Sequence, residues 1–316
     1  MWHLLAHFFA IASAAATILP HRTIFAFPNT TYYDIENVAV RCNGNILLNL
    51  LSEPSLYSLD PSTAGSNATL VHTFENATKL DGIVEYKPDV FAVVAGNALS
   101  NGSSTYAIWS IDFNSQPPTA NKIADVPGAL ALNGLTTITG SYSDLLLIAD
   151  AKMGAIWSLN TTTGLASVAF QDDHFLPTSS IAFGINGIHA RNQRLYFATS
   201  ANNTFGYARI NPANGVFLNE SVTILAHNTP GNVDFDDFAL APDGRYAYVA
   251  NHNRNLTRID TQSGDQDLAV TGLNAPTSAA FDRTNECILY VVTGGQSVNG
   301  TISSGMVVEV ELCESH

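Results

Sequence analysis

Polar residues that could bind a cation or a substrate recur along the chain, each at the start of an apolar stretch. The recurring positions begin at Glu36, Asp81, Asn133, Asn186, Asp236 and Thr277, spaced 41 to 53 residues apart. Carboxylate and carboxamide oxygens are ligands that Ca²⁺ prefers in proteins, whereas zinc is disfavoured because the chain has no cluster of Cys and His. Brought together, these side chains could hold a hard cation or act on a bound small molecule.

The stretch 234–260 shows what surrounds each of these motifs. After a carboxylate pair come an apolar run, an Asp-Gly turn at 243–244, a second apolar run ending at Ala250, a polar loop and a third run. Strand, turn, strand, loop, strand is the order of one propeller blade. The order occurs six times, and repeats of about 40–50 residues indicate radial repetition. The sequence therefore predicts an all-β, six-bladed β-propeller, because the alternative, a β-sandwich, would leave too many strands over.

The N-terminal part of the chain contains two different segments. Residues 1–16, MWHLLAHFFAIASAAA, have the pattern of a cleaved secretory signal and are too short for an ordinary membrane-spanning helix. Residues 21–28, HRTIFAFP, are predicted to form a lone strand. As the outer strand of the last blade, this strand would close the ring and remove an exposed sheet edge. We therefore predict a signal peptide and then a single propeller domain over residues 17–316.

The rest of the composition agrees with a protein of the secretory pathway, either secreted or in a vesicular lumen. A net charge of −14 with only 13% charged residues leaves no basic surface for nucleic acid, so we expect small-molecule partners. No later stretch is apolar enough to span a membrane, and the oligomeric state is not indicated. Candidate N-glycosylation sites begin at Asn29, Asn67, Asn76, Asn101, Asn160, Asn202, Asn219, Asn255 and Asn299.

Three cysteines leave one unpaired if a disulfide forms. Cys287 precedes the second strand of the last predicted blade and Cys313 ends its third strand, and antiparallel neighbours bring those ends together. We favour this pair and expect Cys42 to be free. Cys42 lies in a turn at the same rim, however, and could replace either partner.

Strand direction decides which polar residues can meet. The loops before each first strand and those between second and third strands open on one face, at the mouth of the channel, where a concave polar site is expected. The first set supplies Glu36, Asn37, Asp81, Asn133, Asn186, Asp236, Asp237, Thr277 and Ser278. The second set supplies Glu53, Asn97, Asp150, Asn202, Asn251, His252, Arg254 and Gln296.

A purely structural interpretation of these residues stays open. Asn-Gly pairs and Asp residues before strands are ordinary turn and cap residues. The loop that carries His252 and Arg254 could simply be solvated, and His189, inside a first strand, is expected to be packed in the channel or core. The functional interpretation depends on the recurrence of polar residues at the same place in each blade.

The chain resembles the senescence-marker-protein and gluconolactonase superfamily of six-bladed propellers. In that family, a Glu opening blade 1, Asn residues opening two middle blades and an Asp opening the next hold a divalent cation, usually calcium. The matching residues are Glu36, Asn133, Asn186 in INGI and Asp236 in DDFALAPDG. Asn37 and Val38 follow the glutamate here, where the family has Gly-Pro. The resemblance implies a possible Ca²⁺ site at the channel mouth.

A closer resemblance is to a secreted fungal branch of that superfamily. It is carried by ENVAVRCNG, by LNGLTTI with LLLIADAKMGAIW, and by APTSAAFDRT with LYVVTGG, between residues 36 and 295. Members of this branch with assigned chemistry include hetero-Diels-Alderases that join a tropolone quinone methide to a humulene-type sesquiterpene. The resemblance implies a biosynthetic enzyme of secondary metabolism that requires no cofactor for the cycloaddition.

Three functions fit the predicted site. A hetero-Diels-Alderase would hold an electron-poor enone and an alkene in near-attack geometry and donate hydrogen bonds to the enone oxygen. A Ca²⁺-dependent lactonase would use the cation to activate water, with Asp236 or Asp237 as general base. A non-catalytic propeller would only bind its ligand. The resemblance favours the first function.

Roles are assigned to the mouth residues on this basis. The residues expected to take part in catalysis are Asn133, Asn186, Asp236, His252 and Arg254. Those expected to contact the substrate are Glu36, Asn37, Asp81, Asn97, Asp237, Thr277, Ser278 and Gln296.

Overall fold

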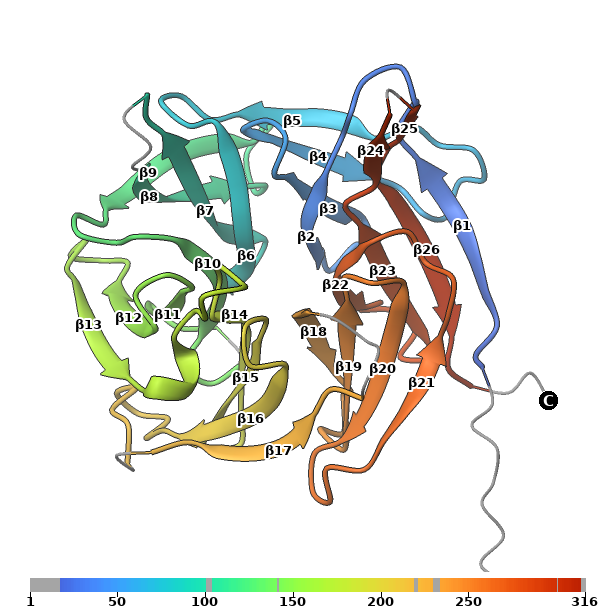
Figure 1. Ribbon diagram of the computed structural model, residues 1–316. Coiled ribbons are helices and arrows are strands. Elements are labelled where there is room, and N and C mark those ends of the chain that lie inside the picture. The colour runs from blue at the N-terminus through green and yellow to red at the C-terminus, as the bar shows by residue number, and fades with distance from the viewer. Residues whose placement is uncertain are drawn as a thin grey trace, which may run out of the picture.

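Six four-stranded antiparallel sheets surround a central channel in the computed structural model of the protein (Figure 1). The structure describes residues 18–100, 104–140, 142–218, 221–229, 234–299 and 301–313. The predicted six-bladed β-propeller is confirmed. The predicted signal peptide lies outside the described residues.

Blades 1 to 5 each use four consecutive strands, of which the first lies next to the channel. Blade 1 consists of β2 (Ile35–Val40), β3 (Ile46–Leu50), β4 (Ser55–Leu59) and β5 (Thr69–Thr73), and blade 2 of β6 (Lys79–Lys87), β7 (Val90–Ala98), β8 (Ser104–Asp112) and β9 (Thr119–Asp125). Blade 3 consists of β10 (Leu132–Thr137), β11 (Leu145–Asp150), β12 (Ala155–Asn160) and β13 (Ala166–Gln171). Blade 4 consists of β14 (Ile185–Arg191), β15 (Arg194–Thr199), β16 (Thr204–Arg209) and β17 (Thr223–His227), and blade 5 of β18 (Phe235–Leu240), β19 (Tyr246–Asn251), β20 (Asn255–Asp260) and β21 (Gln266–Val270). A short 3₁₀ helix, η1 (Asp173–Phe175), precedes blade 4.

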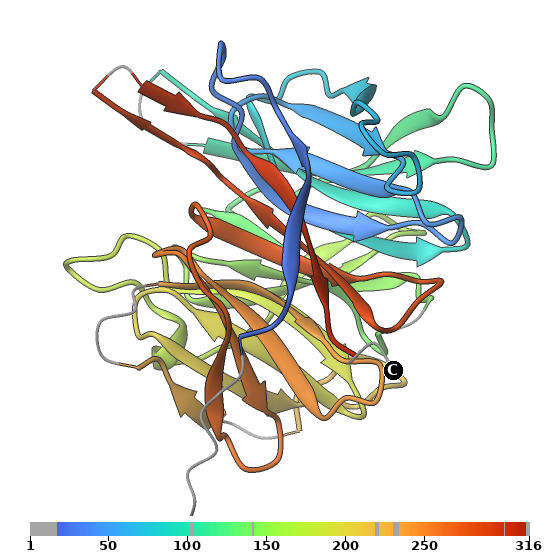
Figure 2. The same cartoon turned by 90° about the vertical axis from the view of Figure 1, so that its right-hand side faces the viewer.

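Blade 6 joins the two ends of the chain. Its strands are β22 (Pro276–Phe281), β23 (Ile288–Thr293), β26 (Met306–Glu311) and, outermost, the N-terminal β1 (His21–Ala26). β1 pairs antiparallel with β26, with His21 opposite Val310 and Ala26 opposite Met306, and Figure 2 shows the two strands side by side. The N-terminal segment therefore occupies the place that the sequence predicts for it.

The hydrophobic core is divided into six clusters, one at each interface between adjacent blades. At the closing interface, Ile35 and Leu48 of blade 1 pack with Val292 and Val307 of blade 6. Burying apolar side chains contributes about 25 cal/mol per Å². Because each blade supplies one half of two interfaces, the loss of any blade exposes apolar surface on both of its neighbours.

Two features of blade 6 lie outside the repeat. A hairpin of β24 (Gln296–Val298) and β25 (Thr301–Ser303) projects from the ring between β23 and β26 (Figure 2), and the sequence did not predict it. A disulfide joins Cys287 to Cys313, whose Cα atoms lie 5.2 Å apart, and Cys42 is free and exposed. The described chain has no helix with the length and hydrophobicity that a membrane span requires.

Candidate functional site

Every innermost strand carries a β-bulge at the position of the recurring polar motif. In β14, for example, Asn186 and Gly187 together oppose a single residue of β15. The same one-residue insertion occurs in β2, β6, β10, β18 and β22. A bulge re-aims side chains next to functional sites. It explains why the consecutive residues Asp236 and Asp237 are both buried at the channel, with 8% and 5% exposure, instead of alternating between faces.

Glycine at the second bulge position lets innermost strands approach closely. A Cβ added to Gly82 would lie 2.5 Å from the carbonyl oxygen of Asn133, and one added to Gly134 would lie 2.5 Å from that of Asn186. Real Cβ atoms do not tolerate such distances, so glycine is required for this close approach. The starts of β6, β10 and β14 therefore lie side by side around the channel.

Polar side chains of one blade hold the bulge of the next. The Asn49 side chain of β3 is fully buried and donates to the backbone oxygen of Asp81 at 2.7 Å. In the same way, the Ser200 hydroxyl donates to the backbone oxygen of Phe235 at 2.9 Å. These bonds satisfy backbone groups that a bulge leaves unpaired and fix the motif residues at the mouth.

A carboxyl cluster forms where these strands begin. Burial, followed by the charges of Asp236, Asp81 and Asp34, raises the pKa of Glu36 well above its ordinary value. Burial likewise raises the pKa of Asp81 and of Asp236. Burial raises the pKa of Asp34 to about 6. Asp236 and Asp81, which are far from Glu36 in sequence, therefore lie close enough for their charges to act on it.

Two cationic side chains lie against this cluster. The ammonium group of Lys79 is 2.8 Å from Asp81 Oδ1; burial opposes its charge, but Asp81 raises the pKa of Lys79 overall. His252 Nδ1 is 3.5 Å from Asp236 Oδ2, and its interaction with Asp236 raises the pKa of His252. The His252 side chain is 53% exposed. It is therefore a protonatable donor at the open side of the cluster.

The carboxamides of the cluster supply oxygens with unused acceptor capacity. Asn133 Oδ1 and Asn186 Oδ1 are buried and have no hydrogen-bond partner among the described residues, and neither does Asp81 Oδ2. Unpartnered buried oxygens beside buried carboxylates are the donor set that a hard cation prefers. The described residues contain no group of three or more His, Cys, Asp or Glu side chains placed to hold a metal ion, so a cation at this opening would depend on the Asn oxygens as well. We name Glu36, Asp81, Asn133, Asn186 and Asp236 the mouth cluster.

Asp237 belongs to a separate layer, one residue further along the strands. Its carboxylate accepts hydrogen bonds from Asn37 Nδ2 at 2.8 Å, His189 Nε2 at 3.1 Å, Ser278 Oγ at 3.3 Å and the Phe238 backbone N–H at 2.8 Å. It therefore links blades 1, 4, 5 and 6 across the channel. With four donors around it, this carboxylate is far less available to a substrate than that of Asp236.

Other predicted residues have structural contacts of their own. Thr277 is buried and donates to the Ile35 backbone oxygen at 2.6 Å. The Asp150 carboxylate accepts from several groups, including the Leu130 and Ala131 backbone N–H groups, within 3.3 Å.

The remaining second-to-third-strand residues do not join the mouth cluster through any contact in the described chain. The Asn251 side chain bonds to Thr257 and Asn228, Glu53 accepts from the Tyr57 hydroxyl, and the Asn202 side chain donates to the His174 backbone oxygen. Asn97 lines a small cavity of about 120 Å³ on blade 2. Gln296 is exposed in β24, and Arg254 is exposed in the same turn as His252 with a backbone φ of 111°.

Sequence reasoning missed three residues at the mouth, Tyr32, Asp34 and Lys79. Tyr32 donates to Asp34 Oδ2 at 3.0 Å, and burial together with Asp34 and Glu36 raises the pKa of Tyr32. For Lys79 the signal was the period of a strand, because side chains at i and i+2 share a face and Lys79 lies two residues before Asp81 in β6. Tyr32 and Asp34 lie in the loop before β2, where no such period applies.

The chain is similar in sequence to named fungal proteins over most of its length. No protein-family profile matches the chain. A Phoma species protein whose name assigns it provisionally to the hetero-Diels-Alderases is 25% identical over 312 residues, covering 86% of each chain. A Sarocladium schorii protein with the same provisional name is 26% identical over 335 residues, covering 88% of this chain and 79% of its own. This chain resembles hetero-Diels-Alderases. The resemblance inferred from sequence motifs is thereby confirmed.

The solved structures agree on the fold. A protein of Agrobacterium tumefaciens described as the calcium-binding protein regucalcin superposes with a TM-score of 0.68 at 14% identity, covering 94% of this chain and 95% of its own. At that identity the likeness supports the six-bladed propeller and nothing finer.

Proposed function

We propose that the protein is a biosynthetic enzyme of the hetero-Diels-Alderase type that joins an electron-poor enone or quinone methide to an alkene at the mouth cluster. The observation that carries the proposal is the similarity to proteins named for this reaction over most of the chain. The tropolone and humulene-type substrates implied by the sequence resemblance are the specific pair that we propose.

His252 is the residue best placed to assist this reaction. A cycloaddition moves no proton, so the protein contributes by orienting both reactants and by stabilising charge that develops on the enone oxygen. The imidazole is half-exposed and lies beside Asp236, and the raised pKa of His252 favours the doubly protonated form that donates hydrogen bonds. Asp236 in turn orients the ring. Asn133 and Asn186 would also contact the polar end of the substrate.

The test is turnover of an ortho-quinone methide with a strained cyclic alkene, followed by mass spectrometry of the adduct. We expect His252→Phe to lower kcat by about 10–100-fold, since one well-placed donor to an oxyanion contributes up to about 10²–10³. The control is His227→Phe, because His227 is exposed on the outermost strand β17, far from the channel strands. Unchanged kcat in His252→Phe would exclude this role, and no adduct above the uncatalysed rate would exclude the reaction.

A second candidate function is a metal-dependent lactonase. The unpartnered oxygens of Asn133 and Asn186 beside Glu36 and Asp236 favour it. These four residues would hold Ca²⁺, which would polarise an ester carbonyl and lower the pKa of a bound water. Lactone hydrolysis that disappears with a chelator and in Asp236→Ala would select this function. Cycloaddition that persists in the chelator would select the first, and binding without turnover would indicate a non-catalytic propeller.

We also propose that the protein enters the secretory pathway. The sequons at Asn29, Asn67, Asn76 and Asn299 are exposed, so glycans could be attached without disturbing the fold. The sequons at Asn101 and Asn219 lie outside the described residues, and those at Asn160, Asn202 and Asn255 are half-buried. A loss of apparent mass on enzymatic deglycosylation of the protein from its native source would support this route, and an unchanged mass would count against it.

A further inference from the structure

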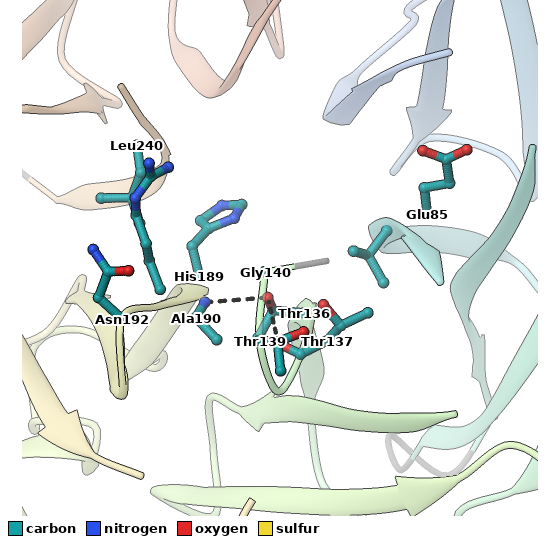
Figure 3. Close-up of a pocket in the computed structure, with 11 residues that line it drawn as sticks. Glu85, Thr136, Thr137, Thr139, Gly140, His189, Ala190, Asn192 and Leu240 are labelled. Atoms are coloured by element: carbon teal, nitrogen blue, oxygen red, sulfur yellow. Dashed lines mark hydrogen bonds between the residues drawn. The ribbon is translucent and has the colours of Figure 1, made fainter. Parts of the chain in front are cut away.

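A cavity of about 440 Å³ lies at the opposite end of the channel from the mouth cluster. It is lined by the far ends of innermost strands from four blades, among them Glu85 of β6, Thr137 of β10, His189 of β14 and Leu240 of β18. The blades follow one another anticlockwise in Figure 1 and clockwise in Figure 3, so the close-up is seen from the other face. We name this cavity the turn-face pocket.

The walls of the turn-face pocket are preorganised. Figure 3 shows the imidazole of His189 and the carboxylate of Glu85 on opposite sides of the opening, with threonines between them. The His189 ring is fixed by its bond to Asp237 and by edge-on contact with Phe238 at 4.7 Å. The Thr136 hydroxyl accepts from the Ala190 backbone N–H at 3.2 Å. A ligand would therefore meet polar groups that are already held in place.

The charges around the pocket are largely compensated within the protein. Glu85 is paired with Arg283 and accepts from the Asp89 backbone N–H at 2.7 Å. His189 is paired with Asp237. Arg191 donates to the Pro242 carbonyl, which does not neutralise its charge, and its Nε is buried without a partner among the described residues. The two guanidinium groups of Arg191 and Arg283 equal the two carboxylates of Glu85 and Asp237 in number, so the surroundings of the pocket carry little net charge to offer an ionic ligand.

The uncharged lining then determines the ligand class. The hydroxyl of Thr137 and the carboxamide of Asn192 can each donate and accept hydrogen bonds, while Val84 and Leu240 supply apolar patches. Ligand pockets usually measure about 300–1,000 Å³. We propose that the turn-face pocket is a second binding site for a neutral, hydroxyl-rich small molecule of about monosaccharide size, separate from the mouth cluster.

The proposal is tested by saturation-transfer NMR on the full chain with myo-inositol and D-glucose as neutral probes and with citrate and spermidine as charged ones. Both neutral probes are expected to bind more tightly than either charged probe. Thr139→Trp, at an exposed rim position, should abolish binding by filling the pocket. Asn192→Gly, which keeps the left-handed backbone (φ 48°), should weaken it about fivefold, the loss expected for one neutral hydrogen bond.

Two controls separate this site from the rest of the molecule. Thr162→Trp adds the same bulk at an exposed turn on blade 3, and Asp236→Asn alters only the mouth cluster; both should bind the neutral probes as the unaltered protein does. Absence of binding by either neutral probe, tighter binding of a charged probe, or unchanged binding in Thr139→Trp would each overturn the proposal. Loss of binding in Asp236→Asn would also overturn it, because the ligand would then occupy the mouth.

Discussion

Replacing each of the two adjacent aspartates of β18 by asparagine should have different consequences for stability. Asp237 receives four hydrogen bonds, three of them from side chains of other blades. In Asp237→Asn, one oxygen becomes an NH₂ group that faces the donors Asn37 Nδ2 and Ser278 Oγ or His189 Nε2. Hydrogen bonds to a charged group contribute about 1.5–3 kcal/mol each, and a buried unsatisfied donor costs about 1–3 kcal/mol. We expect a loss of about 2–4 kcal/mol in the free energy of unfolding.

Asp236→Asn should not show this loss. Burial raises the pKa of Asp236, which means that the folded state disfavours the ionised form. The stability contribution of such a group is complete below its unfolded value of about 3.8 and is lost as the pH rises through the raised folded value. Removing the charge should therefore leave the free energy of unfolding at pH 7 unchanged or higher.

The assay is equilibrium urea denaturation at pH 7, followed by tryptophan fluorescence. Asp243→Asn is the matched control, since Asp243 is an exposed turn residue that accepts one backbone hydrogen bond and should change stability by less than about 1 kcal/mol. If Asp236→Asn and Asp237→Asn are destabilised equally, the two layers inferred at the channel are not distinct, and the reasoning fails.

Three further predictions concern the fold. Removal of residues 1–26 should lower the urea midpoint of the entire ring in one transition, because β1 covers the edge of β26; a separate early transition of blade 6 alone would contradict this. Gly134→Ala should destabilise by at least about 2 kcal/mol, since its Cβ would meet the Asn186 carbonyl at 2.5 Å, whereas the Cβ of Gly96→Ala would meet side-chain atoms of Lys79 and Tyr106 at 2.9 Å rather than a backbone atom, and should cost less; equal midpoints would refute the close approach. Burial would raise the pKa of Asp282, but hydrogen bonds from Thr284 and Tyr290 lower it; Asp282→Asn should therefore reduce the melting temperature at pH 7, and the difference should shrink as the pH falls below about 3.8.

The blade plan could be predicted from sequence because it is encoded locally. Each blade repeats a polar opening, an apolar run and a turn, and the period alone gives six of them. The position of β1 and the pairing of Cys287 with Cys313 follow from the same plan, since ring closure and antiparallel geometry leave few alternatives. The relative positions of segments distant in sequence could therefore be predicted wherever the blade repeat determines them.

The different surroundings of Asp236 and Asp237 at the mouth could not be predicted in the same way. Sequence places Asp236 and Asp237 together, but a bulge changes the register by one residue and sends the second carboxylate into another layer. Nothing in the two letters DD distinguishes a bulge from a regular pleat. The partners that reveal the difference, Asn37, His189 and Ser278, come from three other blades.

The two halves of the channel also differ for a physical reason. Blades 2, 3 and 4 place glycine second in the bulge, so their strands approach closely, and the buried side-chain oxygens of Asn133 and Asn186 keep unused acceptor capacity. Blades 5, 6 and 1 place Asp237, Ser278 and Asn37 there, and these side chains fill their half by bonding to one another. The unpartnered acceptors of the mouth cluster, on Asp81, Asn133 and Asn186, therefore all belong to the glycine half, and a ligand that needs hydrogen-bond acceptors would find them on that side of the channel.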